Sequence, residues 1–222
     1  MRGDLTGTCL IVKHCLKSGH WPSENGCGGR VKTLNSALAV IEVPSVALGY
    51  RALDLLTQNS SLEILEAAVH GSKIFSIIAR GEKSQLETGV HAVSKSISSS
   101  DGSLRDSIVL EKIDPQIVET YFSLHTVELG ESLLVVECET LSGLFQSAQR
   151  AVGSHNLKAI EMRNLRGDNP QALGLFSGAY KDCVAASESI NLTLENNARR
   201  GNVETIQNPN LNFRNFFNLA NV

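Results

Sequence analysis

The pattern of apolar and polar positions along the chain occurs twice. A short apolar run at residues 38–41 is followed by Ser45 and apolar residues at helical spacing, and a run at 133–136 is followed in the same way by Thr140. Serine and threonine are favoured helix N-caps because their side-chain oxygens accept a free backbone N–H. Each copy therefore predicts a strand, a cap and a helix. The predicted apolar helix face is Val46, Tyr50, Leu53 and Leu56 in the first copy and Leu141, Phe145, Ala148 and Ala151 in the second.

The two copies continue alike, with Glu42 and Glu137 at corresponding positions 95 residues apart. Each copy has two more strand-like runs around a polar loop with glycine, then a second helix pattern and a last short strand. These segments are residues 62–69, 74–79, 84–98 and 107–110, then 157–162, 172–176, 179–197 and 203–207. A turn with proline follows each copy, at Pro115 and Pro209. We expect each glutamate to end its strand near the positive end of the helix that follows.

The order β-α-β-β-α-β in each copy predicts an α/β fold class, an α+β sandwich of two tandem domains. We expect an N-terminal extension at residues 1–35, a first domain at 36–130, and a second domain with a short C-terminal tail at 131–222. Gene duplication explains this order simply. Chance similarity of two generic α/β units is the alternative.

Several segments resemble the bacterial microcompartment shell domain. Ala39-Val40-Ile41-Glu42 and Arg51-Ala52-Leu53-Asp54 match the first strand and helix of that domain. Val69-His70-Gly71-Ser72 and Ile78-Ala79-Arg80-Gly81-Glu82 match its pore loop and the strand end that follows. The resemblance covers residues 36–210, and the two copies resemble the tandem-domain shell proteins, which assemble as trimers with a pseudo-hexameric outline. It implies a homotrimer that associates with other shell proteins and with encapsulated enzymes.

The same resemblance implies that the loop between the second and third strands of each copy lines a central pore. The implied pore-lining residues are His70, Gly71, Ser72, Lys73, Arg166, Gly167, Asp168 and Asn169. With three chains around one axis, Lys73 and Arg166 outweigh Asp168, which favours the passage of small polar or anionic metabolites. The alternatives are a surface histidine without a role and a weak local ion pair between Arg166 and Asp168.

The chain departs from single-domain shell proteins at positions used for edge-to-edge tiling. Gln58 and Gly153 stand where that family has a lysine after the first helix. Asp114 and Asn208 stand where it has an arginine before the last proline. We therefore expect the protein to form sheets by itself only weakly, while trimer formation is unaffected.

Composition narrows the classes of partner and compartment. The net charge is −3 and only 19% of the residues are charged, which argues against a nucleic-acid partner. No stretch reaches the ~18 consecutive apolar residues of a membrane span, and Asp4 and Lys13 interrupt any signal-peptide core. We therefore expect no membrane partner and a cytoplasmic location, in the shell of a bacterial microcompartment. The cysteines, Cys9, Cys15, Cys27, Cys138 and Cys183, should then be reduced.

Residues for metal binding and catalysis do not form a recognisable pattern. The N-terminal extension contains the possible ligands Cys9, His14, Cys15, His20 and Cys27, but their spacing matches no compact metal-binding motif. Some tandem shell proteins hold an iron–sulfur cluster through a cysteine in the pore loop, and neither loop here contains one. The chain also lacks a nucleophile elbow, a phosphate-binding loop and a dinucleotide fingerprint. We expect no metal, no cofactor and no enzymatic activity.

These observations favour a structural function. The expected protein is a shell component that forms a pseudo-hexameric trimer with a central pore for small polar or anionic metabolites. The main alternative is a small-ligand-sensing regulatory trimer with ferredoxin-like domains. An electron carrier that uses the N-terminal cysteines is a weaker alternative.

Overall fold

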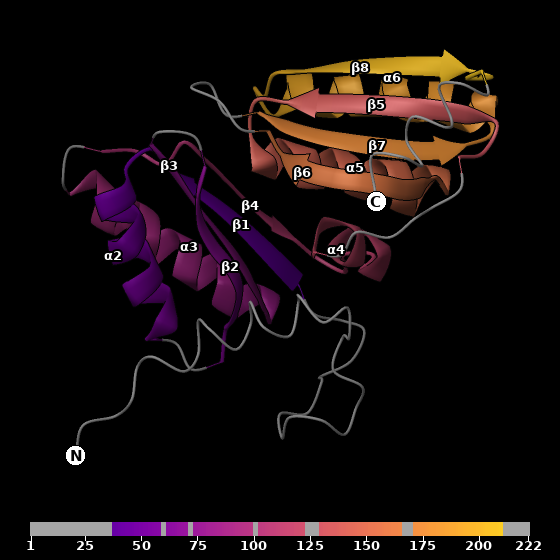
Figure 1. Ribbon diagram of the computed structural model, residues 1–222. Helices are drawn as coiled ribbons and strands as arrows, with labels where there is room; N and C mark the ends of the chain where they lie inside the picture. The colour runs from indigo at the N-terminus through magenta and orange to yellow at the C-terminus, as the bar shows by residue number, and fades with distance from the viewer. Residues whose placement is uncertain are drawn as a thin grey trace. The chain divides into compact units, whose positions relative to one another are not determined.

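The computed structural model describes residues 37–58, 61–70, 73–99, 102–122, 129–165 and 171–210, which lie in one structural unit, Asn35–Val222. The first repeat contains β1 (Ala37–Val43), α2 (Val46–Thr57), β2 (Glu63–His70), β3 (Ile74–Gly81), α3 (Lys83–Ser98) and β4 (Asp106–Leu110). Helix α4 (Pro115–Phe122) follows it. The second repeat contains β5 (Ser132–Cys138), α5 (Leu141–His155), β6 (Lys158–Asn164), β7 (Ala172–Gly178), α6 (Tyr180–Asn196) and β8 (Gly201–Gln207) (Figure 1).

Each repeat forms one antiparallel four-stranded sheet, and the two sheets have the same topology. The strand orders are β2-β3-β1-β4 and β6-β7-β5-β8. The registers also correspond, since Glu42 lies opposite Asp106 and Glu137 lies opposite Asn202. The predicted fold class, an α+β fold of two tandem β-α-β-β-α-β domains, is confirmed.

The predicted N-caps are confirmed in both repeats. The Ser45 hydroxyl accepts a hydrogen bond from the Leu48 N–H at 3.4 Å, and the Thr140 hydroxyl accepts one from the Gly143 N–H at 3.0 Å. These bonds satisfy a backbone donor in the first turn of α2 and of α5. The same local chemistry therefore starts the first helix of each repeat.

Helix α4 is an element that the sequence pattern does not predict, because Asp114-Pro115 indicates only a turn there. Pro115 is instead the first residue of α4. The N–H that proline lacks would have no hydrogen-bond partner within the helix at this position. The Asp114 carboxylate accepts a hydrogen bond from the Gln116 N–H at 2.9 Å and so caps the helix. The helix packs on β6 and α5 of the second repeat.

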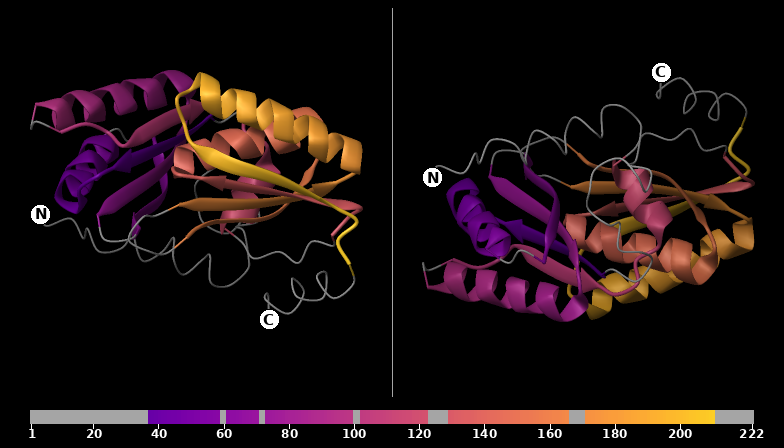
Figure 2. Two further views of the ribbon diagram at one scale, coloured as in Figure 1. Left: turned by 90° about the horizontal axis from the view of Figure 1, so that it is seen from above. Right: turned by 90° about the horizontal axis from the view of Figure 1, so that it is seen from below.

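The two faces of the first sheet have different partners. Alternate residues of a strand point to opposite faces, and in β1 the side chains of Ile41 and Val43 pack with α2 and α3. Leu38 and Val40 point the other way and join the apolar cluster of the second repeat. Helix α5 contacts both β1 and β4 of the first sheet. Figures 1 and 2 show α2 and α3 together beside the first sheet, and α5 and α6 together beside the second.

The predicted apolar face of α2 is only partly correct. Leu56 is buried, but the Tyr50 side chain is 61% exposed, and the buried positions of the helix are Gly49, Ala52 and Leu56. Gly49 allows α2 to approach Phe75 so closely that the helix turns this smaller face toward its own sheet. In α5 the whole predicted face is buried, because the helix packs between its own sheet and the first one.

None of the helices in the described part of the chain is long and apolar enough to span a membrane.

We expect Gly49→Ala to lower the free energy of unfolding, although alanine is the better helix former by about 1 kcal/mol. An added Cβ would lie 2.3 Å from Cγ of the buried Phe75 ring, so the net loss should be about 1–3 kcal/mol. Gly153→Ala in α5 is the matched control. Its added Cβ would meet only the end of the Gln149 side chain, which can shift, and should raise stability by up to about 1 kcal/mol. Urea unfolding of both variants measures the difference, and a Gly49→Ala variant as stable as Gly153→Ala would contradict this packing.

Candidate functional site

The two loops that sequence analysis assigned to a pore leave their sheets at equivalent places. The first connects β2 to β3 and begins after His70, and the second connects β6 to β7 and begins after Asn164. Lys73 is exposed immediately before β3. At the base of the second loop, the Leu165 N–H donates to the Gln171 carbonyl at 2.7 Å. The other predicted pore residues, Gly71, Ser72, Arg166, Gly167, Asp168 and Asn169, lie outside the described residues.

The structure brings the starts of the two loops into contact. The Asn164 Nδ2 atom lies 3.2 Å from His70 Nε2, and it donates a hydrogen bond to the Tyr121 hydroxyl oxygen at 3.2 Å. The Tyr121 hydroxyl in turn donates to Glu66 Oε1 at 3.1 Å. Residues from β2, α4 and β6 therefore form one polar cluster, which we call the loop-base cluster: Glu66, His70, Tyr121 and Asn164.

The presence of a proton on His70 Nε2 decides which partner this atom has in the loop-base cluster. Without that proton, Nε2 accepts from Asn164, and with it, Nε2 donates. Glu66 Oε1 lies 3.5 Å from this nitrogen and is the acceptor available when Nε2 carries a proton. Burial and the neighbouring Glu66 carboxylate raise the pKa of the Tyr121 phenol, so this side chain stays a hydrogen-bond donor.

A cavity of about 580 Å³ lies beside the loop-base cluster. Its lining comes from both repeats and from α4: Glu66, Val69, His70, Tyr121, Met162, Arg163, Asn164 and Leu165. Arg163 also pairs with Glu161 on the same strand at 2.8 Å. Where the two loops start, the cavity thus offers hydrogen-bond donors and acceptors together with an acidic and a basic side chain. Such a lining is suited to holding or passing a polar molecule.

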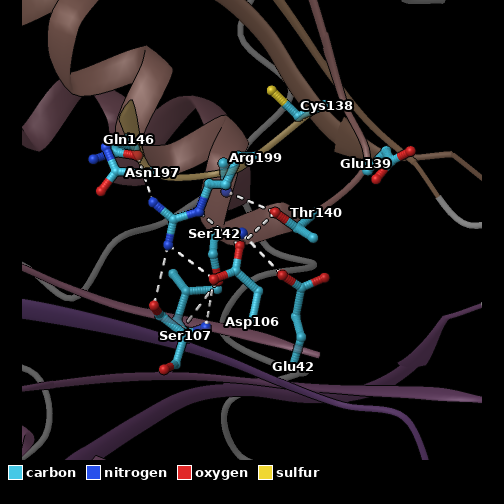
Figure 3. A network of polar contacts seen from close by, with 12 residues as sticks. Glu42, Asp106, Ser107, Cys138, Glu139, Thr140, Ser142, Gln146, Asn197 and Arg199 are labelled. Atoms are coloured by element: carbon cyan, nitrogen blue, oxygen red, sulfur yellow. Dashed lines mark hydrogen bonds and ion pairs between the residues drawn. The ribbon is translucent and has the colours of Figure 1, made fainter. Parts of the chain in front are cut away.

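A second polar cluster joins the two repeats at the N-terminus of α5 (Figure 3). We call it the junction network, formed by Glu42, Asp106, Thr140, Ser142, Gln146 and Arg199. Asp106 receives two hydrogen bonds from Arg199, from Nε at 2.7 Å and from Nη2 at 2.8 Å, and a third from the Thr140 hydroxyl at 2.7 Å. Such a bidentate pair fixes orientation as well as adding energy.

Glu42 corrects the expectation that each glutamate lies at the helix that follows it. The side chain is only 4% exposed, and Oε2 accepts a hydrogen bond from the Ser142 N–H of α5 at 3.0 Å. Glu42 therefore caps a helix of the other repeat, 100 residues along the chain. Burial raises the pKa of the Glu42 carboxyl, and the N–H groups of Ser142 and Leu141 act in the opposite direction. Its counterpart Glu137 is partly exposed and accepts from the Asn202 side chain at 3.2 Å.

The two cysteines in the described part of the chain are free thiols, Cys138 and Cys183, and both are buried. Burial raises the pKa of the Cys138 thiol to about 11 and raises that of Cys183 as well. Buried protonated thiols are poor nucleophiles and poor metal ligands. Cys9, Cys15 and Cys27, with the neighbouring histidines of the N-terminal extension, lie outside the described residues.

Sequence analysis did not find most members of the two clusters. Asp106 and Arg199 are 93 residues apart, and neither stands in a local motif. Tyr121 and its helix had a local signal, because Asp114-Pro115 followed by Ile117 and Val118 is a typical helix start. The sequence pattern predicts a role for three members: His70 in its loop, Thr140 as a helix cap, and Glu42 at a helix N-terminus, although the helix is that of the other repeat.

We expect Asp106→Ala to lower the free energy of unfolding by about 3 kcal/mol, because it leaves the Arg199 guanidinium largely buried without its carboxylate. Combining it with Arg199→Met should restore part of the loss, which a double-mutant cycle measures. Glu111→Ala removes the exposed pair of Lys83 and Glu111 and serves as the control, with little expected change. Additive effects of the two changes at the junction would contradict a direct pairing.

We also expect the free energy of unfolding to depend on pH through Glu42. Because burial raises its pKa, the folded chain binds this proton more tightly than the unfolded chain does, and the stability it contributes is lost as pH rises through the folded pKa. The native chain should therefore lose stability relative to Glu42→Gln as the pH rises above about 4. Denaturant titrations at several pH values measure this difference, in which the other titrating groups cancel. A difference that grows in favour of the native chain would contradict it.

Comparison with known proteins found one similar sequence of known role and solved structures with a similar fold. No known protein-family model matches the chain. The chain is 21% identical over 160 residues to the bacterial microcompartment shell protein PduT of Citrobacter freundii. The aligned region covers 70% of this chain and 85% of PduT.

Two solved structures have a similar fold. A microcompartment protein from Desulfitobacterium hafniense superposes with a TM-score of 0.68 at 16% identity, over 81% of this chain and 98% of that one. A double-ringed trimeric shell protein of the RMM microcompartment superposes with a TM-score of 0.55 at 12% identity, over 72% of this chain and 82% of that one. Both have the arrangement of secondary structure found here.

Proposed function

We propose that this chain, a microcompartment shell protein of the tandem-domain type by its sequence and fold, forms a homotrimeric tile with a pseudo-hexameric outline and a central pore. The observation that carries the proposal is the contact between His70 and Asn164, which brings the starts of the two loops together within one chain. Three chains arranged around an axis would place six such hairpin ends in alternation. A cyclic trimer closes because each chain uses one surface to contact the next chain and a different surface to contact the previous one.

The same proposal extends to partners, location and domain limits. The tile would associate with other shell proteins and with encapsulated enzymes in a cytoplasmic microcompartment, and its role would be structural rather than catalytic. The similarity to PduT and to a trimeric shell protein supports this context. We propose domain limits at residues 36–130 and 131–222, with residues 1–35 as an extension of separate role.

The proposed trimer predicts a solution mass of about three times the 23.9 kDa chain mass. Size-exclusion chromatography with light scattering at micromolar concentration measures it. Negative-stain electron microscopy of the same sample should show particles with six similar lobes. A chain that remains at its monomer mass over this concentration range would overturn the proposal.

The proposed pore favours small anions, because Lys73 and Arg166 together outweigh Asp168 around the axis and a narrow opening concentrates their field. We expect His70→Ser combined with Arg166→Ser to reduce anion selectivity, measured as the reversal potential across a planar lipid bilayer under a potassium chloride gradient. The matched control is Lys181→Ser with His91→Ser, which removes one basic side chain and one histidine from exposed positions on α6 and α3. Both variants should keep the native oligomeric mass. Equal selectivity in the native and loop variants would refute the pore assignment.

A further inference from the structure

We infer that Glu137 caps helix α2 of a neighbouring copy of this chain and that Tyr50 of that helix is buried in the same contact. This inference rests on the proposed trimer and names the residues that would hold its chains together. It follows from the duplicated structure, because one contact between repeats is present inside the chain and its two surfaces recur. The helix surface recurs on α2, where Tyr50 is exposed, and the sheet surface recurs in the second repeat, where Val135 and Glu137 are only partly buried.

The contact inside the chain supplies the template. Helix α5 packs on the first sheet, where Leu38, Val40 and Ile78 belong to the same apolar cluster as Phe145. Phe145 and Ala148 are both 0% exposed. Glu42 closes the end of this contact by accepting the Ser142 N–H. Apolar packing and one carboxyl cap therefore act together.

The helix side of the template recurs in α2 without a partner sheet. Ala47, Tyr50 and Leu53 stand 95 residues before Ser142, Phe145 and Ala148. Ala47 is exposed and Leu53 is only partly buried. Tyr50 is 61% exposed, and the centre of its ring lies 5.0 Å from that of Phe75. Tyr50 is a large aromatic side chain that is exposed, whereas the equivalent Phe145 is buried against a sheet. This difference indicates that Tyr50 is also covered by a sheet when the chain has its partner.

The sheet side of the template recurs in the second repeat. Leu133 and Val135 stand 95 residues after Leu38 and Val40. The strand registers correspond as well: Leu175 of β7 lies opposite Val135, and Ile78 of β3 lies opposite Val40. Leu133 and Leu175 are buried within the chain, whereas Val135 and Glu137 are only partly buried. These side chains belong to a separate apolar cluster together with Ile160, Leu173 and Ile206. Glu137 lies at the end of this face, as Glu42 does in the first repeat.

The two contacts differ at the ion pair. The strand registers match Asp106 with Asn202, and the same alignment matches Arg199 with Ser103. The contact between chains would therefore lack the bidentate pair. Glu137 would take the place in it that Glu42 has in the contact within the chain. We conclude that the charge of Glu137 and the ring of Tyr50 control how readily the chains separate.

Sedimentation velocity over a range of concentrations tests this with Glu137→Ala and Tyr50→Ser in the full chain. Each change should raise the concentration at which the trimer dissociates at least tenfold, and the double variant should sediment as a monomer with unchanged circular dichroism. The matched controls are Glu188→Ala and Leu192→Ser, an exposed acid and an exposed apolar residue on α6, which should leave dissociation unchanged.

Cross-linking covers the case in which those variants do not fold. In a chain with Cys9, Cys15 and Cys27 changed to serine, Ala47→Cys and Glu137→Cys together should give covalent dimers and trimers with a short bismaleimide, and neither change alone should do so. Two results would overturn this inference while leaving the proposed function intact, provided that the native chain is a trimer. One is the absence of cross-linked dimers and trimers, and the other is that the variants dissociate like the controls. A native chain that is monomeric would overturn both.

Discussion

A four-stranded sheet has two faces, and the two helices of one repeat cover only one of them. In the first repeat the other face is covered by α5 of the second repeat, which leaves Leu38, Val40 and Ile78 without exposed surface. Removing apolar surface from water is the main favourable contribution to folding. The two repeats therefore share one apolar cluster, and the position of every other contact between them depends on this packing.

The junction network orients that packing. Apolar surfaces can slide over one another at little cost, but a buried carboxylate without its donors is strongly unfavourable. Glu42 has its backbone donor only when the N-terminus of α5 lies over the end of β1, and Asp106 has its bidentate partner only when Arg199 approaches β4. The same orientation places α4 between β2 and β6, where Tyr121 contacts both Glu66 and Asn164. The arrangement of the loop starts is thus a consequence of polar contacts made elsewhere in the chain.

Duplication explains why equivalent positions carry different side chains. Phe145, Asp106 and Arg199 lie in a contact that forms as the chain folds, so a fully apolar ring and a largely buried ion pair are suitable there. Tyr50, Asn202 and Ser103 occupy the matching positions on surfaces that meet water in the free chain. A tyrosine combines an apolar ring with a hydroxyl that can face solvent, which suits a surface exposed before association. In the proposed trimer, the differences between the repeats would follow the difference between a contact within a chain and one between chains.

Local chemistry allowed the sequence by itself to determine the elements and their order. The alternation and length of apolar runs predicted the strands, Ser45 and Thr140 predicted the helix starts, and the repeat at 95 residues predicted two copies of one fold. These features depend on neighbours a few positions away, which a linear pattern records. The Asp114-Pro115 start of α4 was also local, but it was interpreted as a turn.

Tertiary structure alone decided which faces and side chains meet. The pattern of α2 and α5 is nearly the same, yet Phe145 is buried and Tyr50 is exposed, because a second sheet covers only α5 in this chain. Glu42 and Glu137 occupy equivalent positions, yet only Glu42 reaches a helix N-terminus in the described structure. Hydrophobic periodicity reports that a side chain prefers burial, and it carries no information on which distant surface buries it. That choice is made by the packing of one repeat on the other.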